Sequence, residues 1–389
     1  MRAATVVLLL AACGSDARVE PDGGTATDGG RHDAGSAADA GGLPPPPERA
    51  AALCAALDEY LAGTNTPGAV LATRFPDGST HACAGGVASI ADATPMRTGD
   101  RFRIGSVSKT FVAATVLLLA EDGLLSLEDP LSRWVAGFEE SDPTLAQMLN
   151  HTSGLGEYLF DDGLQATRDQ PHDAAELVDL ARSKPIARPP GGRFEYANTN
   201  YLLMSTVIEA ATRTPWQQIV RERVLDPLAL EDTFVYGFEE TPPFVTGYEW
   251  DRSTNVDVTV AVHPTVASAA GCFVSSAADL LRWAEALYGG SVLSPASLEA
   301  MNELYRVPHA HDGGVYEGAF VGLANFIETD ETFGEVYGHS GGLPGFGTNM
   351  RYMEREGRVL VVLVNGTDPT ADPNPIDALT NAGWIALLL

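Results

Sequence analysis

Segments with strand-forming patterns lie at both ends of this chain, and a long region with helical spacing separates them. Residues 67–75 and 80–90 predict a β-hairpin around a turn at 77–79, and residues 48–61 predict a helix before it. Later strands and a last helix are expected over 321–328, 335–340, 348–354, 358–365 and 375–389. This order predicts an α/β protein of the α+β type, in which both chain ends build one antiparallel sheet flanked by the N- and C-terminal helices. A mostly helical lobe, about residues 125–290, is inserted between them.

The region between the two strand-rich ends has apolar residues at helical spacing. Helices are expected over 145–150, 174–182, 201–212, 215–224 and 277–287. Ser275 and Ser276 supply polar caps for the last of these helices. An earlier helix is predicted from Ser106 to about Glu121, after a short extended stretch at 101–104.

The first 47 residues differ in composition from the rest of the chain. Residues 1–12 combine a basic start, a short apolar core and small residues before Cys13, which is typical of an export signal and too short to cross a bilayer. Because it ends on cysteine, the segment resembles a bacterial lipoprotein signal, which implies cleavage before Cys13 and acylation there. A plain secretory signal with an incidental cysteine is the alternative. Residues 13–47, rich in Asp-Gly units and proline, predict a disordered, lipid-anchored linker to a domain over 48–389.

These features predict an exported protein, lipid-anchored to a bacterial cell membrane and facing the periplasm or the cell surface. The formal net charge of −28 argues against a nucleic-acid partner and against electrostatic binding to anionic lipid. The membrane contact would therefore be made through the lipid anchor. The apolar run at 111–120 is better explained as a buried helix than as a membrane span.

Three cysteines remain if Cys13 is lipidated. Cys54 in the first helix and Cys83 in the second strand form the candidate disulfide, which leaves Cys272 free. Three buried thiols are the alternative.

Two residues at the start of the Ser106 helix have the chemistry of a nucleophile and its activator. Only two of the 24 lysine and arginine residues are lysines, and one of them, Lys109, stands three positions after Ser106. Arginine stays protonated, whereas a buried lysine can lose its proton near neutral pH. On a helix the two side chains share one face, so a neutral Lys109 amine could activate the Ser106 hydroxyl.

Two further segments carry polar groups suited to the same chemistry. Tyr196 beside a lysine ammonium could lose and shuttle a proton, and Asn198 could hold both the lysine and a substrate amide. At the end of a predicted strand, residues 338–342 read Gly-His-Ser-Gly-Gly, where glycines let a substrate approach the backbone.

With these three elements in this order, the chain resembles the penicillin-recognising serine hydrolases: class C β-lactamases, D-alanyl-D-alanine carboxypeptidases, D-aminopeptidases and related esterases. The segments at 151–155, 198–201, 227–230 and 339–346 also match the group. The resemblance implies a β-lactamase/transpeptidase-like fold from about residue 48 to the C-terminus. It also implies a small-molecule or peptide substrate, such as a D-amino-acid peptide, a β-lactam or an ester, with no cofactor and no metal.

The resemblance also implies a role for each site residue. Ser106 would be the acylated nucleophile, Lys109 its base or proton relay, and Tyr196 a general acid and base. Substrate-binding roles fall to Asn198, His339, Ser340 and Gly341. The N–H groups of Ser106 and Gly342 would form the oxyanion hole. Which of Lys109 and Tyr196 takes the proton stays open.

One departure from the family bears on the substrate. His339 stands where many relatives have lysine, as in carboxypeptidase-like members. Those members bind the substrate carboxylate with an arginine on the preceding strand, but residues 322–328 contain none and Phe326 lies about where it is expected. Arg351 on the next strand is a possible substitute. The sequence thus predicts a serine hydrolase of the D-alanyl-D-alanine carboxypeptidase or β-lactamase type, or an esterase or D-aminopeptidase, with specificity for a free D-Ala end in doubt.

Two histidine-containing segments could suggest a catalytic triad or a metal site, but neither is expected to be catalytic. A Ser-His-Asp interpretation would recruit His151, yet the resemblance places it in a structural turn. Residues 309–312, His-Ala-His-Asp, lack a further convincing ligand group for a metal. A catalytically silent, lipid-tethered binding module is the alternative from another class, and the complete Ser106, Lys109, Tyr196 and Asn198 set argues against it.

Overall fold

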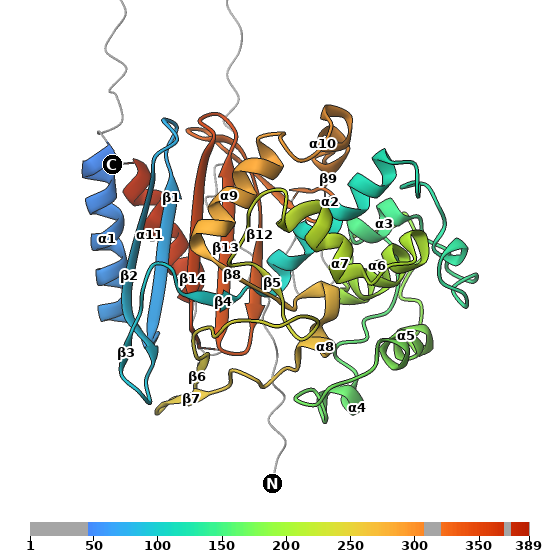
Figure 1. Ribbon diagram of the computed structural model, residues 1–389, viewed down its shortest axis with the longest axis horizontal. Coiled ribbons are helices and arrows are strands. Elements are labelled where there is room, and N and C mark those ends of the chain that lie inside the picture. Colours follow the sequence, from blue (N-terminus) through green and yellow to red (C-terminus); the bar gives the residue numbers. More distant parts are fainter. Residues whose placement is uncertain (1–45, 307–319, 369–374, 389) are drawn as a thin grey trace, which may run out of the picture.

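The computed structural model describes residues 46–306, 320–368 and 375–388 (Figure 1). The expected signal at 1–12, the expected lipidation site Cys13 and nearly all of the expected linker lie outside these residues, as does the histidine-containing segment at 309–312. Helix α1 begins at Pro46, two residues before the expected start of the domain. Among the described residues, no helix is long and apolar enough to span a membrane.

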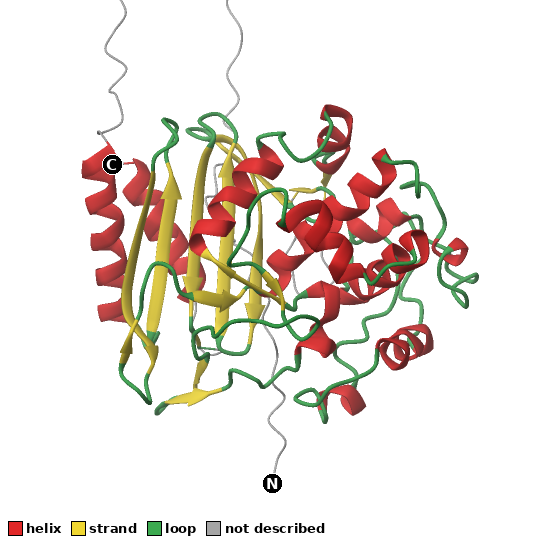
Figure 2. Ribbon diagram, viewed as in Figure 1, coloured by secondary structure: helices red, strands yellow, loops and turns green. Residues whose placement is uncertain are grey.

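The main sheet is antiparallel, and strands from both ends of the chain meet at its centre (Figures 1 and 2). Its order within the described residues is β3-β2-β1-β14-β13-β12-β11-β10-β9. The strands are β1 (Gly68–Arg74), β2 (Thr80–Ser89), β3 (Thr94–Pro95), β9 (Tyr305–Arg306), β10 (Phe320–Val321), β11 (Phe326–Asp330), β12 (Gly334–Leu343), β13 (Phe346–Met353) and β14 (Arg358–Val364). Because β1 pairs with β14, the expectation of one sheet built from both chain ends is confirmed.

Helices cover both faces of this sheet. Helix α1 (Pro46–Gly63) and helix α11 (Pro375–Leu388) lie together on the outer face, and α9 (Ala277–Tyr288) and the lobe lie on the inner face (Figure 1). Side chains alternate between these faces along each strand. In β14, Leu360 and Val362 join the outer cluster, while Val359 and Val361 join the inner core.

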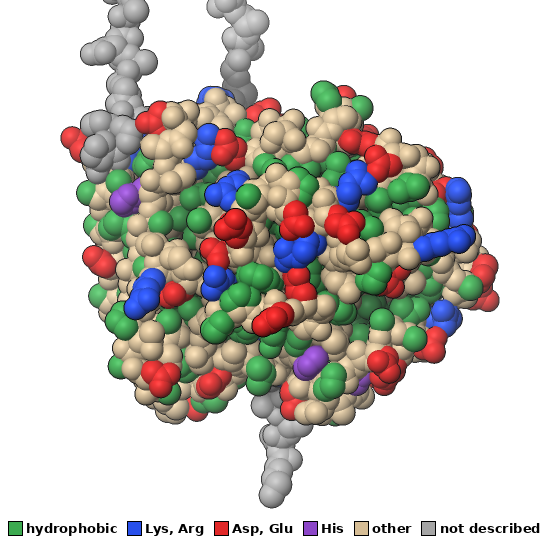
Figure 3. All heavy atoms as spheres, viewed as in Figure 1, with side chains coloured by type: hydrophobic (Ala, Val, Ile, Leu, Met, Phe, Trp, Pro, Cys, Tyr) green, Lys and Arg blue, Asp and Glu red, His purple; other side chains and the backbone are tan. Residues whose placement is uncertain are grey.

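Within the inserted lobe, α6 (Asn198–Thr212) is the most deeply buried long helix. The helices of the lobe and of the segments that flank it are α2 (Ser108–Glu121), α3 (Leu145–Leu149), α4 (Asp162–Gln165), α5 (Ala174–Ser183), α6, α7 (Trp216–Val220), α8 (Pro264–Ala267) and α10 (Pro295–Met301), with short turns at Gly105–Val107, Leu131–Arg133 and Ser268–Ala270 and a π-helical turn at Arg221–Leu225. Phe111 of α2 stacks on Trp283 of α9 at 4.3 Å between ring centroids, which joins the lobe to the layer above the sheet. Acidic and basic side chains are interspersed over the face shown in Figure 3.

The structure corrects several sequence-based expectations. The single strand expected over 321–328 is wrong: β10 and β11 form a hairpin that turns between them. Ala324 in this turn has φ 66°, and a side chain on Gly322 would meet the Met301 carbonyl oxygen, so close packing forces the turn. Helix α6 begins three residues before the expected residue 201.

Short strands outside the main sheet form two small sheets, and all of them except β4 were missed. They are β4 (Arg101–Arg103), β8 (Phe273–Ser276) and β5 (Phe234–Val235) in one small sheet, and β6 (Tyr248–Trp250), β7 (Asn255–Asp257) and β15 (Gly366–Thr367) in another. The partners of β4, β5, β8 and β15 are distant in sequence, so a local pattern gives little sign of them. Strands β6 and β7 pair locally but have only three residues each. Of these, only β4 matches an expected extended stretch.

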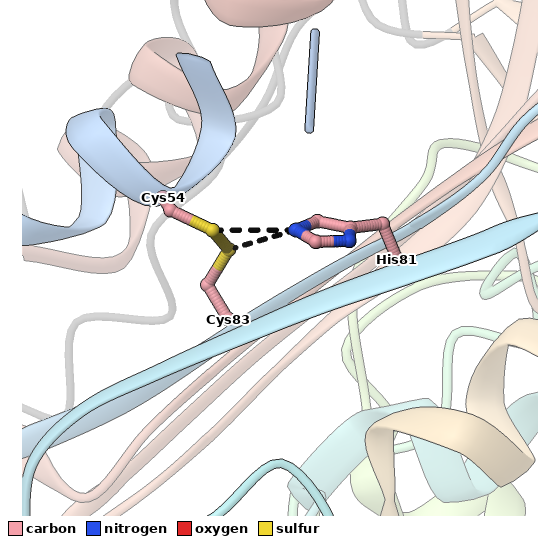
Figure 4. The surroundings of a disulfide bond; sticks show 3 residues. All are labelled: Cys54, His81 and Cys83. Carbon is pink, nitrogen blue, oxygen red and sulfur yellow. Dashed lines mark hydrogen bonds between the residues drawn. A yellow bond between two sulfur atoms is a disulfide. The ribbon is translucent and has the colours of Figure 1, made fainter. Parts of the chain in front are cut away.

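A disulfide joins Cys54 of α1 to Cys83 of β2, as expected, with 5.4 Å between the two Cα atoms (Figure 4). It links the outer helix to the edge of the main sheet. Cys272 is a free, fully buried thiol, and burial raises its pKa.

Candidate active site

Ser106 lies in a short turn pressed against the end of β12. Gly105, just before it, has φ 50°, and a side chain there would come within 2.8 Å of the Gly342 backbone nitrogen. Only glycine fits such a position without strain. The turn therefore holds Ser106, which is 5% exposed, at the boundary between the sheet and the lobe.

Lys109 lies one helical turn after Ser106 and is completely buried. Its Nζ lies 2.9 Å from Ser106 Oγ, 2.9 Å from Asn198 Oδ1 and 2.7 Å from the Ala270 carbonyl oxygen. Burial lowers the pKa of Lys109 to about 7, and the Glu157 carboxylate partly opposes this shift. At neutral pH the amine thus exists in both protonation states, next to the serine hydroxyl.

Two aromatic rings enclose the Lys109 amine. The Nζ atom lies 5.0 Å from the ring centroid of Tyr196 and 5.4 Å from that of Tyr201. Rings at this distance stabilise the ammonium form and exclude water, so they keep the amine desolvated without neutralising it.

His151 supports this arrangement from behind, as a structural residue. Its ring stacks on Tyr196 with 4.2 Å between centroids, and its Nδ1 accepts a hydrogen bond from the Ala197 N–H at 3.1 Å. Burial, with the neighbouring Lys109, holds the pKa of His151 well below its usual value, so the ring is neutral. Its backbone has φ 61°, as the turn requires. His151 thus packs on the Tyr196 ring and holds it in place.

Glu157 belongs to the site, although the sequence analysis did not single it out. One carboxylate oxygen accepts hydrogen bonds from the Asn198 backbone N–H at 2.5 Å and from its Nδ2 at 3.3 Å, and the other accepts from the Leu159 N–H at 2.7 Å. Desolvation raises the pKa of Glu157, while these donors lower it. Because Asn198 Oδ1 accepts from Lys109, a chain of hydrogen bonds runs from Glu157 through Asn198 to the amine.

On β12, His339 is buried between the lobe and β11. Its Nδ1–H donates to the Ser340 carbonyl oxygen at 2.5 Å, and its ring lies 5.2 Å from Phe326 and 6.3 Å from Tyr196 between centroids. Burial, with the nearby Lys109, lowers the pKa of His339 to about 3. The imidazole is therefore neutral and does not supply a positive charge at this position.

Arg351 on β13 reaches Ser340 from the side opposite to β11. Its Nη2 donates to Ser340 Oγ at 3.0 Å, and its Nε lies 3.7 Å from a Glu328 oxygen. Arg351 pairs with Gly338 across the sheet, and Gly338 pairs with Phe326 on the other side. The Arg351 backbone is two strands from the expected place, but its side chain crosses β12 over Gly338 toward β11. The Ser340 hydroxyl hydrogen stays able to bind a further acceptor.

A small pocket opens above Ser106. Strand β11 pairs with β12 only over Gly334–Gly338, and beyond that β12 faces the Ser106 turn. The polar lining comes from Ser106, Asn198 and Gly342, so both expected oxyanion-hole residues border the pocket. The rest of the lining is Gly105, Leu159, Phe160, Ala267, Ala270, Gly271 and Leu343. The pocket therefore combines a serine, backbone donors and an apolar wall.

The structure brings together Ser106, Lys109, Tyr196, Asn198 and His339 from three distant parts of the sequence. Ser340, Gly341 and Gly342 lie on the strand beside them, and a side chain on Gly341 would meet the Ile104 carbonyl oxygen. Such an arrangement can activate a hydroxyl, stabilise an oxyanion and transfer a proton.

Known proteins are similar to this chain in both sequence and fold. The β-lactamase family model matches residues 53–382. The chain is 28% identical over 303 residues to a penicillin-binding protein of Bacillus subtilis, covering 73% of this chain and 65% of that protein. It is 27% identical over 313 residues to a D-aminopeptidase of Cereibacter sphaeroides, covering 78% of this chain and 56% of that one. The chain thus spans less than two thirds of the length of these two curated relatives.

Among solved structures, the D-amino acid amidase of Ochrobactrum anthropi, complexed with L-phenylalanine amide, superposes with a TM-score of 0.76 at 26% identity. This match covers 87% of this chain and 99% of the amidase. The fold, the family match and the site geometry agree. The chain belongs to the β-lactamase family of serine hydrolases.

Proposed function

We propose that this protein is an acyl-transfer hydrolase that works through a covalent ester on Ser106. The observation that carries the proposal is the completely buried Lys109 amine, 2.9 Å from Ser106 Oγ and with a pKa near 7. A neutral amine there can accept the hydroxyl proton while Ser106 Oγ attacks the substrate carbonyl. The N–H groups of Ser106 and Gly342 would hold the resulting oxyanion.

The second half of the cycle returns the proton and frees the enzyme. When the carbon–nitrogen or carbon–oxygen bond of the substrate breaks, the leaving group takes a proton from the Lys109 and Tyr196 pair. Water then attacks the seryl ester and gives up a proton to the same pair. The pair passes this proton to Ser106 Oγ as the ester bond breaks, which releases the acid and restores the Ser106 hydroxyl. Asn198 would hold both the amine and the substrate amide during these steps.

For the substrate, we propose a peptide or amide with a D-amino acid on the acyl side, such as a peptidoglycan stem peptide. The names of the D-aminopeptidase and D-amino acid amidase relatives support this class. The apolar wall of Leu159, Phe160 and Leu343 suits the side chain of such a residue. A D-alanyl-D-alanine carboxypeptidase activity is less favoured, because Phe326 stands where an arginine would bind a free carboxylate and Arg351 already contacts Ser340 and Glu328.

A labelling experiment tests the mechanism, and a substrate panel tests the class. A fluorophosphonate or fluorescent penicillin should modify wild type on Ser106, found by peptide mass spectrometry, and Ser106→Ala should lose labelling and turnover. Ser183→Ala, an exposed serine on α5, is the matched control. An unlabelled wild type would support a silent binding module instead. In the panel, D-amino-acid amides and esters should rival free-acid D-Ala peptides, and a large preference for the free acid would reverse the substrate assignment.

We also propose that the protein is exported and anchored through an acylated Cys13. Residues 1–13 support this by their basic start, apolar core and terminal cysteine. Full-length protein made in a bacterium should partition into detergent, and Cys13→Ala should carry no acyl chain. Mass spectrometry that finds an unmodified mature end at or beyond residue 14 would refute the anchor.

A further inference from the structure

A histidine lies against the disulfide on the outer layer, far from the catalytic residues in the sequence. Cys83 and His81 are two residues apart on β2, so their side chains share the face that packs on α1. Cys54 comes from α1 itself. The Nε2 atom of His81 lies 3.3 Å from Cys54 Sγ and 3.5 Å from Cys83 Sγ (Figure 4).

The geometry points to a second use for these three residues: when the disulfide is reduced, Cys54, His81 and Cys83 form a Zn²⁺ site. Their three ligand atoms lie within 4.8 Å of one another. Two thiolates and one imidazole are a donor set that zinc prefers, with water as the fourth ligand. Cys54 and His81 are only partly buried, so solvent can reach that fourth position.

The two distances from His81 Nε2 to the cysteine sulfurs already match those of a zinc site. A tetrahedral ion with Zn–S of about 2.3 Å and Zn–N of about 2.0–2.1 Å separates a sulfur from a nitrogen ligand by about 3.5 Å and two sulfurs by about 3.8 Å. Both nitrogen–sulfur separations of His81 match this spacing. Only the sulfur–sulfur separation must grow, and breaking the disulfide allows that.

The conversion balances with a dithiol or phosphine as reductant. Two electrons and two protons break the bond between Cys54 and Cys83 and give two thiols. A dithiol reductant becomes a disulfide, and a phosphine becomes its oxide with an oxygen atom from water, which also supplies the two protons. Zn²⁺ then displaces the two thiol protons and binds two thiolates and the neutral His81, so the site carries no net charge. The ion would link α1 to β2 as the disulfide does, in conditions where the disulfide cannot persist.

The test compares oxidised and reduced forms of the full chain, which needs no variant to fold. The protein is reduced with a phosphine, desalted under anaerobic conditions and incubated with Zn²⁺. Elemental analysis should then find one zinc ion per chain in the reduced protein and none in the oxidised protein. Co²⁺ in place of Zn²⁺ should give a thiolate-to-metal charge-transfer absorption in the reduced form alone. Zinc retained equally by both forms, or by neither, would overturn the proposal.

A histidine variant tests whether the imidazole is a ligand. His81→Ala should weaken zinc binding to the reduced protein by at least about tenfold in competition with a chromophoric chelator, since even outer-shell partners of metal ligands are worth that much. His172→Ala, a partly exposed histidine of the lobe, is the control and should not change the affinity. Both are made with Cys272→Ser, so that only two thiols remain among the described residues. An affinity equal in His81→Ala and its control would show that His81 is no ligand.

Discussion

The two faces of the main sheet are built from different chemistry. On the outer face, α1 and α11 bury a layer of aliphatic side chains such as Leu53, Leu71 and Leu360, closed at one edge by a disulfide. Between the sheet and the lobe, an apolar core is also buried, but beside the pocket it includes a lysine and two histidines, at Lys109, His151 and His339.

This difference separates the part of the molecule that stabilises the fold from the part that carries the chemistry. Aliphatic burial stabilises a fold by about 25 cal/mol per Å². Burial of ionisable groups opposes folding, as the lowered pKa values of Lys109 and His339 show. The contrast predicts that changes on the outer face act on stability and changes at the lobe face act on rate.

A large effect on rate, with the fold preserved, is expected at Tyr196. Tyr196→Phe keeps the ring that packs beside Lys109 and on His151 but removes the hydroxyl that transfers a proton. A general acid–base group is typically worth about 10²–10⁴ in rate, and kcat should fall by that factor with little change in the melting temperature. Steady-state kinetics with thermal unfolding check this. A loss under about threefold would remove Tyr196 from the proton path.

On the outer face, Leu360→Ala should do the reverse. Leu360 is 1% exposed on β14, and truncating a buried leucine costs about 2–5 kcal/mol in the free energy of unfolding. Chemical denaturation should detect this loss, while kcat of the remaining folded enzyme stays within about twofold of wild type. If kcat fell in proportion to stability, the two faces would not be separable.

Lys109→Met sharpens the comparison, because it should destroy activity and stabilise the protein. A folded-state pKa near 7, below the ordinary value of lysine, means that folding favours loss of the proton. The free-energy cost of burying this amine is fully present below pH 7. It disappears as the pH rises toward the ordinary pKa of lysine. Methionine removes it, so the free energy of unfolding should rise by about 1–2 kcal/mol at pH 6, with a smaller gain at pH 9. A gain that does not depend on pH would contradict this explanation.

The sequence was informative where the interactions are local. Ser106 and Lys109 share a helix face at a separation of three residues, so their pairing followed from position alone. The outer helices α1 and α11 and the strand β14 were likewise predicted from the local pattern of apolar residues. Glu157 was missed because its partner Asn198 is 41 residues away, and an isolated glutamate in a loop carries no pattern. The hairpin of β10 and β11 was missed because Leu323 and Ala324, two apolar residues, occupy its turn.

The smallest effect is expected for Glu157→Gln. The Glu157 charge raises the pKa of Lys109, so its removal should lower that pKa. The amine would then be neutral at lower pH, and the acidic limb of the acylation profile should move to lower pH with a nearly unchanged maximum rate. Stopped-flow acylation across pH measures this shift. Movement to higher pH, or none, would mean that Glu157 does not act on the lysine.

The most direct test of the mechanism is single-turnover acylation of Lys109→Arg across pH. Arginine keeps the positive charge but cannot give up its proton, so a lysine that acts as base cannot be replaced by it. The account predicts a loss of at least about 10²-fold and a rate that no longer rises through pH 7. Acylation within about threefold of wild type would show that Lys109 acts through its charge alone and would contradict the assignment.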